Sequence, residues 1–290
     1  MASGGINAQA QTGFAKSAAY DEHRPSYPAA SVQELLEQCR VAGKQGAKIV
    51  DLAAGTGKFT ELLVAREEGF EVVAIEPHEG MREVLEKKQL PRTTVLDGKG
   101  DSMPIGDASV DAVIVAQVGA NPFPPVSILR VPQERHTALY VVTHGPRAQL
   151  LSISQAFHWF AEMSSLQEIH RVLGTHGVLG MIWNIEDYNA PKKHKAATAY
   201  EQKIHGLTWT FDDNEPRFRH EQWRQVFDNQ IKSTPLSLIK AADPLFALPL
   251  GEHHERWEVR MSKEKLWERY STLSQVAIQE GEALEVCCAL

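Results

Sequence analysis

The chain has 290 residues, of which 43% are hydrophobic and 23% are charged, a composition typical of a globular protein with one large domain. Its formal net charge of −7 argues against the predominantly basic surface that binds nucleic-acid backbones. Three cysteines without disulfide or metal-ligand spacing, a polar start without a signal-peptide core, and no run approaching about 18 apolar residues predict a cytoplasmic protein without a membrane or nucleic-acid partner.

Short β-rich runs alternate with helical patterns along the chain. In order, a capping-box pattern starts a helix at Ser31, and the predicted strands are 48–52, 71–75, 93–96, 111–115 and 177–183, separated by helices over 59–68, around 81–85 and from Ser165 to Leu173. This alternation is typical of a parallel sheet covered on both faces. The fold class expected is α/β, with a doubly wound, mostly parallel, Rossmann-like sheet.

A glycine-rich turn follows the first predicted strand. Asp51 ends the strand, Ala53 follows it, and Gly55 and Gly57 form a tight bend before a helix. A dinucleotide-binding turn would have a glycine where this chain has Thr60. S-adenosylmethionine (SAM) has no pyrophosphate but carries an ammonium group whose hydrogen bonds Asp51 can accept, so the turn favours SAM over a nicotinamide or flavin cofactor.

Acidic residues also follow the second and third predicted strands. Glu76, followed by Pro77, can hold both ribose hydroxyls of a nucleotide in a bidentate grip, although it could also be a surface acid. Asp101 can accept the adenine amino group, the backbone N–H of Ser102 can serve a ring nitrogen, and Met103 either packs on the adenine or belongs to the core.

At these residues the chain resembles the type-11-like class I methyltransferases of a fungal and slime-mould group related to yeast trans-aconitate methyltransferase. The shared motifs are Tyr20-Asp21-x-x-Arg24-Pro25-x-Tyr27-Pro28, the glycine turn, Gly100-Asp101, Ala156-Phe157-His158-Trp159-Phe160, and Trp183-Asn184. The resemblance extends from about Phe14 to Glu285, apart from the stretch after Gln117.

The resemblance implies that residues 1–30 fold over the bound cofactor, before a methyltransferase domain at 31–290. Tyr20, Arg24 and Tyr27 would then contact SAM, with Arg24 suited to its carboxylate. Alternatively, this segment only packs the N-terminus on the sheet. Gln117, at the end of the fourth strand, would border the methyl group.

Residues 118–155 interrupt the family pattern, which runs directly from the fourth strand into the aromatic run. Valine and glutamine stand at the two ends of the interruption, and both are compatible with intron boundaries. Our hypothesis is a translated retained intron or a gene-model error. The alternative is a genuine substrate lid, because long irregular loops in compact domains are usually functional or disordered.

The family usually closes its sheet with a β-hairpin. The stretch 236–246 is the candidate for a sixth strand, and no strand-like run follows Glu285. We therefore expect the sheet to lack its last strand. An unpaired edge would make the chain less stable than an ordinary family member.

His158 is the candidate catalytic residue, since ligands bind beyond the carboxyl ends of strands in open α/β sheets. It could be a general base or a wall of the pocket, whereas His170 is more plainly structural. An acceptor pocket under a helical insertion at about 189–228 is expected, lined by Trp183, Trp209, Phe211 and Trp223 unless these pack in the core. The basic cluster 192–195 is interpreted as a solvated helix face, with a targeting signal as the alternative.

The predicted reaction is methyl transfer from SAM to an O, N or S atom of a small molecule. Such transfers need little beyond alignment, because the sulfonium already activates the methyl group. Two alternatives stay open: a non-catalytic or misassembled isoform, and a nicotinamide-dependent Rossmann enzyme, which Thr60 disfavours.

Overall fold

The computed structural model describes residues 26–117, 157–212, 216–230, 244–271 and 273–277, and the backbone of two strands at 131–143 and 152–153. The expected contacts of Tyr20 and Arg24 lie outside these residues, as does the end of the chain after residue 277. Within the part described, no helix is long and apolar enough to cross a membrane.

A parallel sheet forms the first half of the fold, as predicted. Its strands are β1 (Lys48–Leu52), β2 (Glu71–Ile75), β3 (Thr93–Leu96) and β4 (Val110–Gln117), in the spatial order β3-β2-β1-β4. Buried Ile49, Val50, Ala112 and Val113 pair across β1 and β4. Because all four strands run in one direction, their carboxyl ends meet along one edge of the sheet.

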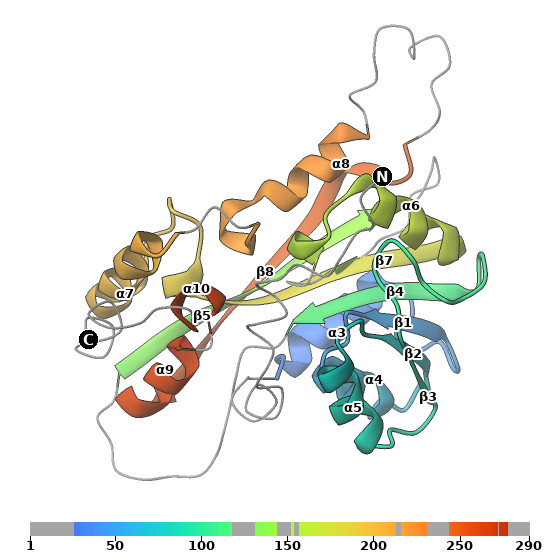
Figure 1. Ribbon diagram of the computed structural model, residues 1–290, viewed down its shortest axis with the longest axis horizontal. Coiled ribbons are helices and arrows are strands. Elements are labelled where there is room, and N and C mark those ends of the chain that lie inside the picture. The colour runs from blue at the N-terminus through green and yellow to red at the C-terminus, as the bar shows by residue number, and fades with distance from the viewer. Residues whose placement is uncertain are drawn as a thin grey trace, which may run out of the picture.

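Helices α3 (Ala29–Gln38), α4 (Lys58–Val64), α5 (Glu79–Lys87) and α6 (Met163–Val172) connect these strands or cover them (Figure 1). The His78 side chain caps α5 by accepting the Met81 N–H at 3.3 Å. The predicted helix start at Ser31 is wrong, because α3 begins two residues earlier, after Pro28. Instead of capping the helix, the Ser31 hydroxyl donates to the Glu255 carboxylate.

Strand β7 (Leu173–Glu186) is the fifth strand of the prediction, but it is longer at both ends. It runs parallel to β4, with Val113 opposite Leu179 and Gln117 opposite Trp183. All its residues from Gly177 to Glu186 are buried. β7 therefore lies at the centre of the molecule, and its carboxyl end reaches the same sheet edge as those of β1 and β4.

Residues 118–155, for which no regular element was expected, contribute strands β5 (Val131–Thr143) and β6 (Ser152–Ile153). β5 runs antiparallel to β7 on one side and to β8 (Ala247–Met261) on the other. The sheet order is thus β3-β2-β1-β4-β6-β7-β5-β8. Most of the predicted sixth-strand stretch, up to residue 243, lies outside the described residues, and β8 begins just after Phe246.

Helices α7 (Ala199–Thr210), α9 (Lys263–Tyr270) and α10 (Ser274–Ala277) lie at one end of β5, β7 and β8, whereas α8 (Gln225–Asn229) lies on the side of α6 (Figure 1). The same part of the chain also has the short helical turns η2 (Asp187–Asn189), η3 (Phe218–His220) and η4 (Gln222–Arg224). A small apolar cluster of Tyr188, Ile204, Leu266, Tyr270 and Val276 joins α7, α9 and α10 to the end of β7.

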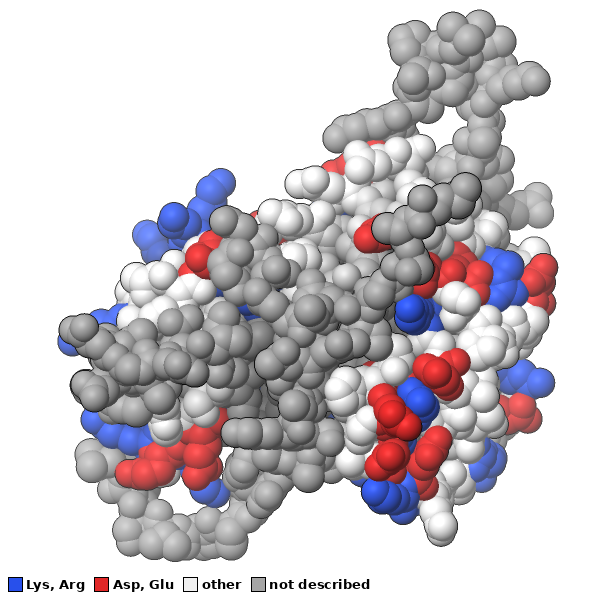
Figure 2. Space-filling view, in the orientation of Figure 1, with Lys and Arg blue, Asp and Glu red and all other residues white. Residues whose placement is uncertain are grey.

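Charged side chains lie intermixed over the region of α4 and α5 (Figure 2). Lys88 pairs with Glu61 at 2.9 Å and joins these two helices. The basic cluster 192–195 lies in the loop before α7, so its assignment to a helix face is wrong. Two of the four aromatic residues assigned to a pocket, Trp183 and Trp223, belong to the main core.

Candidate functional site

The glycine turn between β1 and α4 has backbone geometry that few side chains tolerate. Ala53, Gly55 and Gly57 have φ angles of 56°, 58° and 85°, in the left-handed region that glycine adopts without strain. A Cβ atom on Gly57 would lie 2.2 Å from Leu85 Cδ1, which is buried against the turn. Gly57 therefore lets the start of α4 approach α5 closely.

Asp51, at the end of β1, has a fully buried side chain. Its Oδ2 accepts the Thr60 hydroxyl at 2.6 Å, whereas its buried Oδ1 has no hydrogen-bond partner among the described residues. Burial, with a smaller contribution from the nearby Glu76 carboxylate, raises the pKa of Asp51 to about 7 against the lowering effect of its hydrogen bonds with Thr60. A positively charged ligand group with N–H donors would give Oδ1 a hydrogen-bond partner and would stabilise the ionised form of the carboxylate.

Thr60 has a role that sequence reasoning missed. The sequence pattern indicated Thr60 only as a residue that a dinucleotide-binding turn would not have. In the structure its buried hydroxyl fixes one oxygen of Asp51. A hydroxyl in the first turn of a helix after a glycine bend is the signal that could have indicated this contact.

Glu76, at the end of β2, is also buried and lies across the glycine turn. Its Oε2 accepts the Gly55 N–H and its Oε1 the His78 N–H, each at 2.8 Å. Burial raises the pKa of Glu76 to about 7 despite these two hydrogen bonds. Pro77, the next residue, is half-buried. The turn thus holds two buried carboxylates at the ends of adjacent strands; the sequence predicted their positions but not their burial.

The predicted adenine-binding turn has a different hydrogen-bonding pattern from the one expected. Asp101 is exposed, and the Ser102 N–H, expected to be free for a ring nitrogen, donates to the Lys99 carbonyl at 3.1 Å. Met103 is buried in the main core, and its N–H donates to Glu168 at 2.6 Å. Asp101 and Ser102 therefore have exposed side chains, and of these Asp101 carries the carboxylate that can accept from an adenine amino group.

The aromatic run after the insert packs on this turn. A Cβ atom on Gly100 would lie 2.5 Å from the Phe160 ring, so Gly100 permits the contact. The buried Phe157 lies edge-on to Phe160 at 5.5 Å. Two motifs far apart in the sequence are thereby brought together at one end of the sheet.

His158 is buried in the short helix η1 (Phe157–Trp159), and its Nδ1 has no hydrogen-bond partner among the described residues. Burial lowers the pKa of His158 to about 3, with the positive charge of Arg217 as the next cause. The imidazole is therefore neutral near pH 7 and keeps an acceptor nitrogen. A base this weak is poorly matched to removing a proton, because an efficient general base has a pKa near the working pH.

The structure describes the surroundings of some of the other predicted site residues. The Tyr27 ring is buried and lies edge-on to Phe59, at the start of α4, with ring centroids 5.4 Å apart. The Asn184 side chain donates to the Ser26 carbonyl at 3.4 Å, which joins this segment to β7. Gln117 pairs with Trp183 in the sheet, and its side chain lies outside the described residues.

Residues 49–141, which include the glycine turn and both buried carboxylates, match the family model of a methyltransferase domain. This match agrees with the methyltransferase predicted from the sequence, and with SAM as the cofactor predicted from Asp51 and the two glycines.

Relatives of the methyltransferase domain come from bacteria and fungi. An uncharacterised methyltransferase of Mycobacterium bovis is 33% identical over 169 residues, which cover 58% of this chain and 50% of the relative. One from Schizosaccharomyces pombe is 29% identical over 183 residues, covering 63% and 56% of the two chains. The chain thus spans about half the length of these relatives.

Solved structures are also similar to this chain. A SAM-dependent methyltransferase from Aquifex aeolicus has 20% sequence identity and a TM-score of 0.31, and the match covers 50% of this chain and 62% of that one. The YcgJ protein of Bacillus subtilis has 17% identity and a TM-score of 0.36, with 67% and 66% of the two chains covered.

Proposed function

We propose that this chain transfers a methyl group from SAM to an O, N or S atom of a small molecule. The observation that carries the proposal is the pair of buried carboxylates, Asp51 and Glu76, on either side of the Gly55–Gly57 turn. Two desolvated acids at adjacent strand ends are costly unless a ligand supplies a positive charge or hydrogen-bond donors.

The residues present fit SAM. Asp51 has a buried oxygen that can accept from the ammonium group, and Glu76, pre-oriented by two backbone N–H groups, can accept from the ribose hydroxyls. Asp101 is exposed next to the Gly100–Phe160 contact and is our candidate for the adenine amino group. When bound, SAM supplies an electrophilic methyl group on a positively charged sulfur.

The protein's own contribution is to bind and align the two molecules. We propose that His158 orients the acceptor through its free Nδ1 rather than by taking a proton, because its pKa is too low for a general base. A His158→Ala variant should keep its affinity for S-adenosylhomocysteine (SAH) and lose methyl transfer. Unchanged transfer would leave His158 with a packing role only.

We also propose that the chain belongs to the fungal and slime-mould group of methyltransferases. An uncharacterised methyltransferase-like protein of Schizosaccharomyces pombe supports this assignment, with 26% identity over 72% of this chain.

We further propose that the protein is cytoplasmic. Imaging of a tagged chain in a fungal cell would test this location.

Thermal melts with SAM, SAH and NAD test the cofactor. We expect saturating SAM or SAH to raise the melting temperature by several degrees, since a ligand that binds only the native state stabilises it, and NAD to have no effect. A shift with NAD alone would favour the nicotinamide alternative. Folded protein that responds to none of the three would favour a non-catalytic protein.

The acceptor requires a separate experiment. The chain should be incubated with SAM carrying a labelled methyl group and a small-molecule extract, with heat-inactivated protein as the control. Label in a small molecule supports the proposal, whereas label found only in protein or nucleic acid would overturn the small-molecule assignment.

A further inference from the structure

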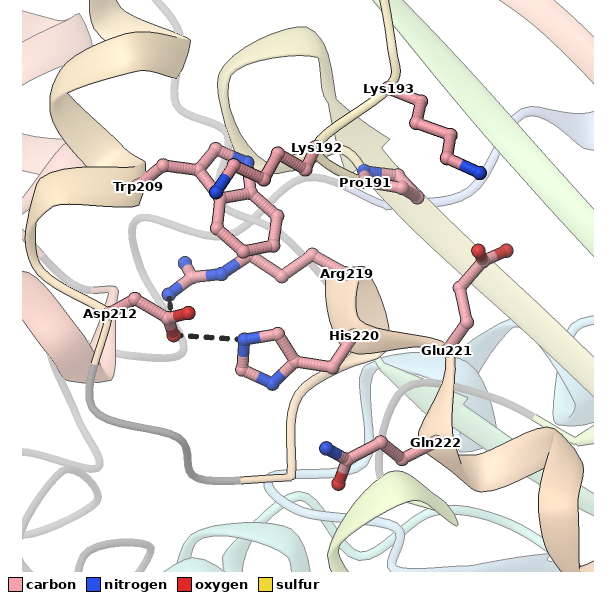
Figure 3. Close-up of a pocket in the computed structure, with 9 residues that line it drawn as sticks. All are labelled: Pro191, Lys192, Lys193, Trp209, Asp212, Arg219, His220, Glu221 and Gln222. Atoms are coloured by element: carbon pink, nitrogen blue, oxygen red, sulfur yellow. Dashed lines mark hydrogen bonds and ion pairs between the residues drawn. The ribbon is translucent and has the colours of Figure 1, made fainter.

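A cavity of about 350 Å³ lies between the loop before α7 and the helices η3 and η4. Figure 3 shows its lining, in which basic and aromatic side chains predominate on one side: Pro191, Lys192, Lys193, Trp209, Asp212, Arg219, His220, Glu221 and Gln222. The volume is large enough for a small organic ligand.

The Trp209 indole forms a fixed wall of this cavity. Its Nε1–H donates to the Ala190 carbonyl at 3.3 Å and to His205 Nε2 at 3.1 Å. Two cations lie near the ring, with the Arg219 guanidinium 4.9 Å and the Lys192 ammonium 5.7 Å from its centroid. Since cations are attracted to an indole face, the ring holds the long Lys192 side chain at the cavity.

Arg219 and His220 share one acidic partner. The Arg219 side chain is completely buried and donates to Asp212 Oδ1 at 3.1 Å, and His220 Nε2 lies 2.8 Å from the same oxygen. Asp212 therefore balances the charge of the buried guanidinium and fixes the two side chains in place.

The two lysines are left as the basic groups that can take a ligand. Neither Lys192 nor Lys193 forms an ion pair within the described parts of the chain, and both are exposed. The lining contains two acids, and one of them, Asp212, is already engaged by Arg219 and His220, so Glu221 is the other negative group at the cavity. Around Trp209 the lining thus presents positive charge to an incoming molecule.

Side-chain contacts connect the cavity to the candidate methyl-transfer site. Arg217, at the start of η3, lies with its guanidinium 5.7 Å from the centroid of Trp159. The rings of Trp159 and His158 are 5.0 Å apart, and the next residue, Phe160, contacts Gly100. The η3 segment, whose Arg219 and His220 line the cavity, thus contacts the aromatic run that packs on the predicted adenine-binding turn.

We propose that this cavity binds the anionic group of the methyl acceptor, a carboxylate or a phosphate, through Lys192 beside the Trp209–Arg219 wall, with Lys193 on the opposite side of the cavity (Figure 3). The inference rests on the proposed function for its acceptor role, although the anion site itself can be measured without any methyl transfer. It names a chemical class of substrate for the reaction proposed above.

Binding to the SAH-saturated protein tests the proposal, measured by calorimetry and by tryptophan fluorescence. The probes are succinate, inorganic phosphate and the uncharged dimethyl succinate. We expect succinate or phosphate to bind to one site and the diester not to bind. Binding of succinate alone indicates a carboxylate, and binding of phosphate alone a phosphoryl group. Folded, SAH-binding protein that binds neither anion would overturn the proposal.

Charge reversal on the loop provides the matched comparison. Lys192→Glu should weaken anion binding at least tenfold, because it places a carboxylate at the ligand. Lys195→Glu makes the same change on an exposed residue of the same loop that does not line the cavity, and should weaken binding less than twofold. Equal effects of the two variants would show non-specific attraction and refute the site.

The outcomes separate this inference from the proposed function. Both variants are on an exposed loop and should keep the SAH affinity of the original chain. Protein that binds anions in a Lys192-dependent manner but never binds SAH would contradict the proposed function and the acceptor role together. Protein that binds SAH but no anion would contradict only the inference.

Discussion

Asp51 and Glu76 show how a candidate cofactor site could be predicted from single residues. Each acid ends a strand that the sequence predicts, and parallel strands place their ends at one edge. The positions of the two acids at the ends of predicted parallel strands were therefore sufficient to predict that their carboxylates lie close together. Their raised pKa values follow from burial, which the sequence does not reveal.

The stability of the free protein should depend on pH through Asp51. Its pKa rises from 3.8 to about 7 on folding, so the native state holds the proton more tightly. The stability this provides is fully present below about pH 4 and is lost as pH rises through 7. Asp51→Asn should thus gain stability relative to the original chain, by more than about 1 kcal/mol at pH 8 and by little at pH 4.

Urea unfolding of both proteins without ligand, at several pH values, measures this difference. Comparing the two profiles cancels the contribution of other groups, such as Glu68, whose pKa is lowered to about 2 by its hydrogen bonds with Arg66. A difference that does not change with pH would show that Asp51 is ionised at its ordinary pKa.

Alanine substitutions at Gly57 and Gly43 separate the cost of backbone strain from the cost of steric overlap. Both have positive φ angles, 85° and 74°, but a Cβ atom on Gly43 would meet nothing within 4 Å. Gly43→Ala should therefore cost about 1 kcal/mol from strain alone. Gly57→Ala should cost about 1–3 kcal/mol more, because the methyl group overlaps the buried Leu85.

Chemical denaturation of the two variants measures these costs. Equal losses would mean that Leu85 moves aside freely, and the close approach of α4 to α5 would then contribute little to the turn.

His158 and the aromatic residues mark the limit of residue-level prediction. The sequence left His158 as a base or a wall, and only its burial near Arg217 shows a neutral imidazole. Trp183 and Trp209 had equal standing as pocket residues. Their difference arises from tertiary packing, since Trp183 is enclosed by Phe218 and Trp223 whereas Trp209 lines a cavity.

Among the elements, the parallel strands were predictable and β5 was not. The runs at β1, β2 and β4 are short, apolar and bounded by turns, as buried strands are. Residues 131–143 have no clear period, and their strand is defined by pairing with β7 and β8, which lie far away in the sequence. Non-local pairing of this kind cannot be read from a local pattern.

β5 makes the two hypotheses for residues 118–155 testable. Its position between two strands favours a genuine part of the fold over a retained intron or gene-model error, because deletion would remove a partner from both β7 and β8. We expect a variant without residues 118–155 to be less stable or insoluble. A deletion variant that melts at a higher temperature would instead support the intron hypothesis.

A single substitution tests the same point more mildly. Leu139 pairs with Ile182 on one side and His253 on the other. Leu139→Pro removes a backbone donor from the middle of the sheet and should cost about 3 kcal/mol, whereas Leu139→Val keeps it. Melting temperatures that do not differ between the two variants would contradict the pairing.

In the whole molecule, the carboxyl ends of β1, β2, β4 and β7 meet at one edge of the sheet, where the predicted cofactor and acceptor residues lie. The helices that follow β7 carry the cavity proposed for the acceptor. The parallel strands followed from the sequence. The contacts of α7, η3 and α9 did not, since these helices are held by a few buried side chains of their own.

The most direct test of the proposed SAM site is calorimetric titration of SAH into the original chain and into the Asp51→Asn and Glu76→Gln variants. We predict one binding site in the original chain and at least about tenfold weaker binding in each variant, because each loses a charge-assisted hydrogen bond. Folded protein that does not bind SAH, or variants that bind it with unchanged affinity, would contradict the assignment of these carboxylates to the cofactor.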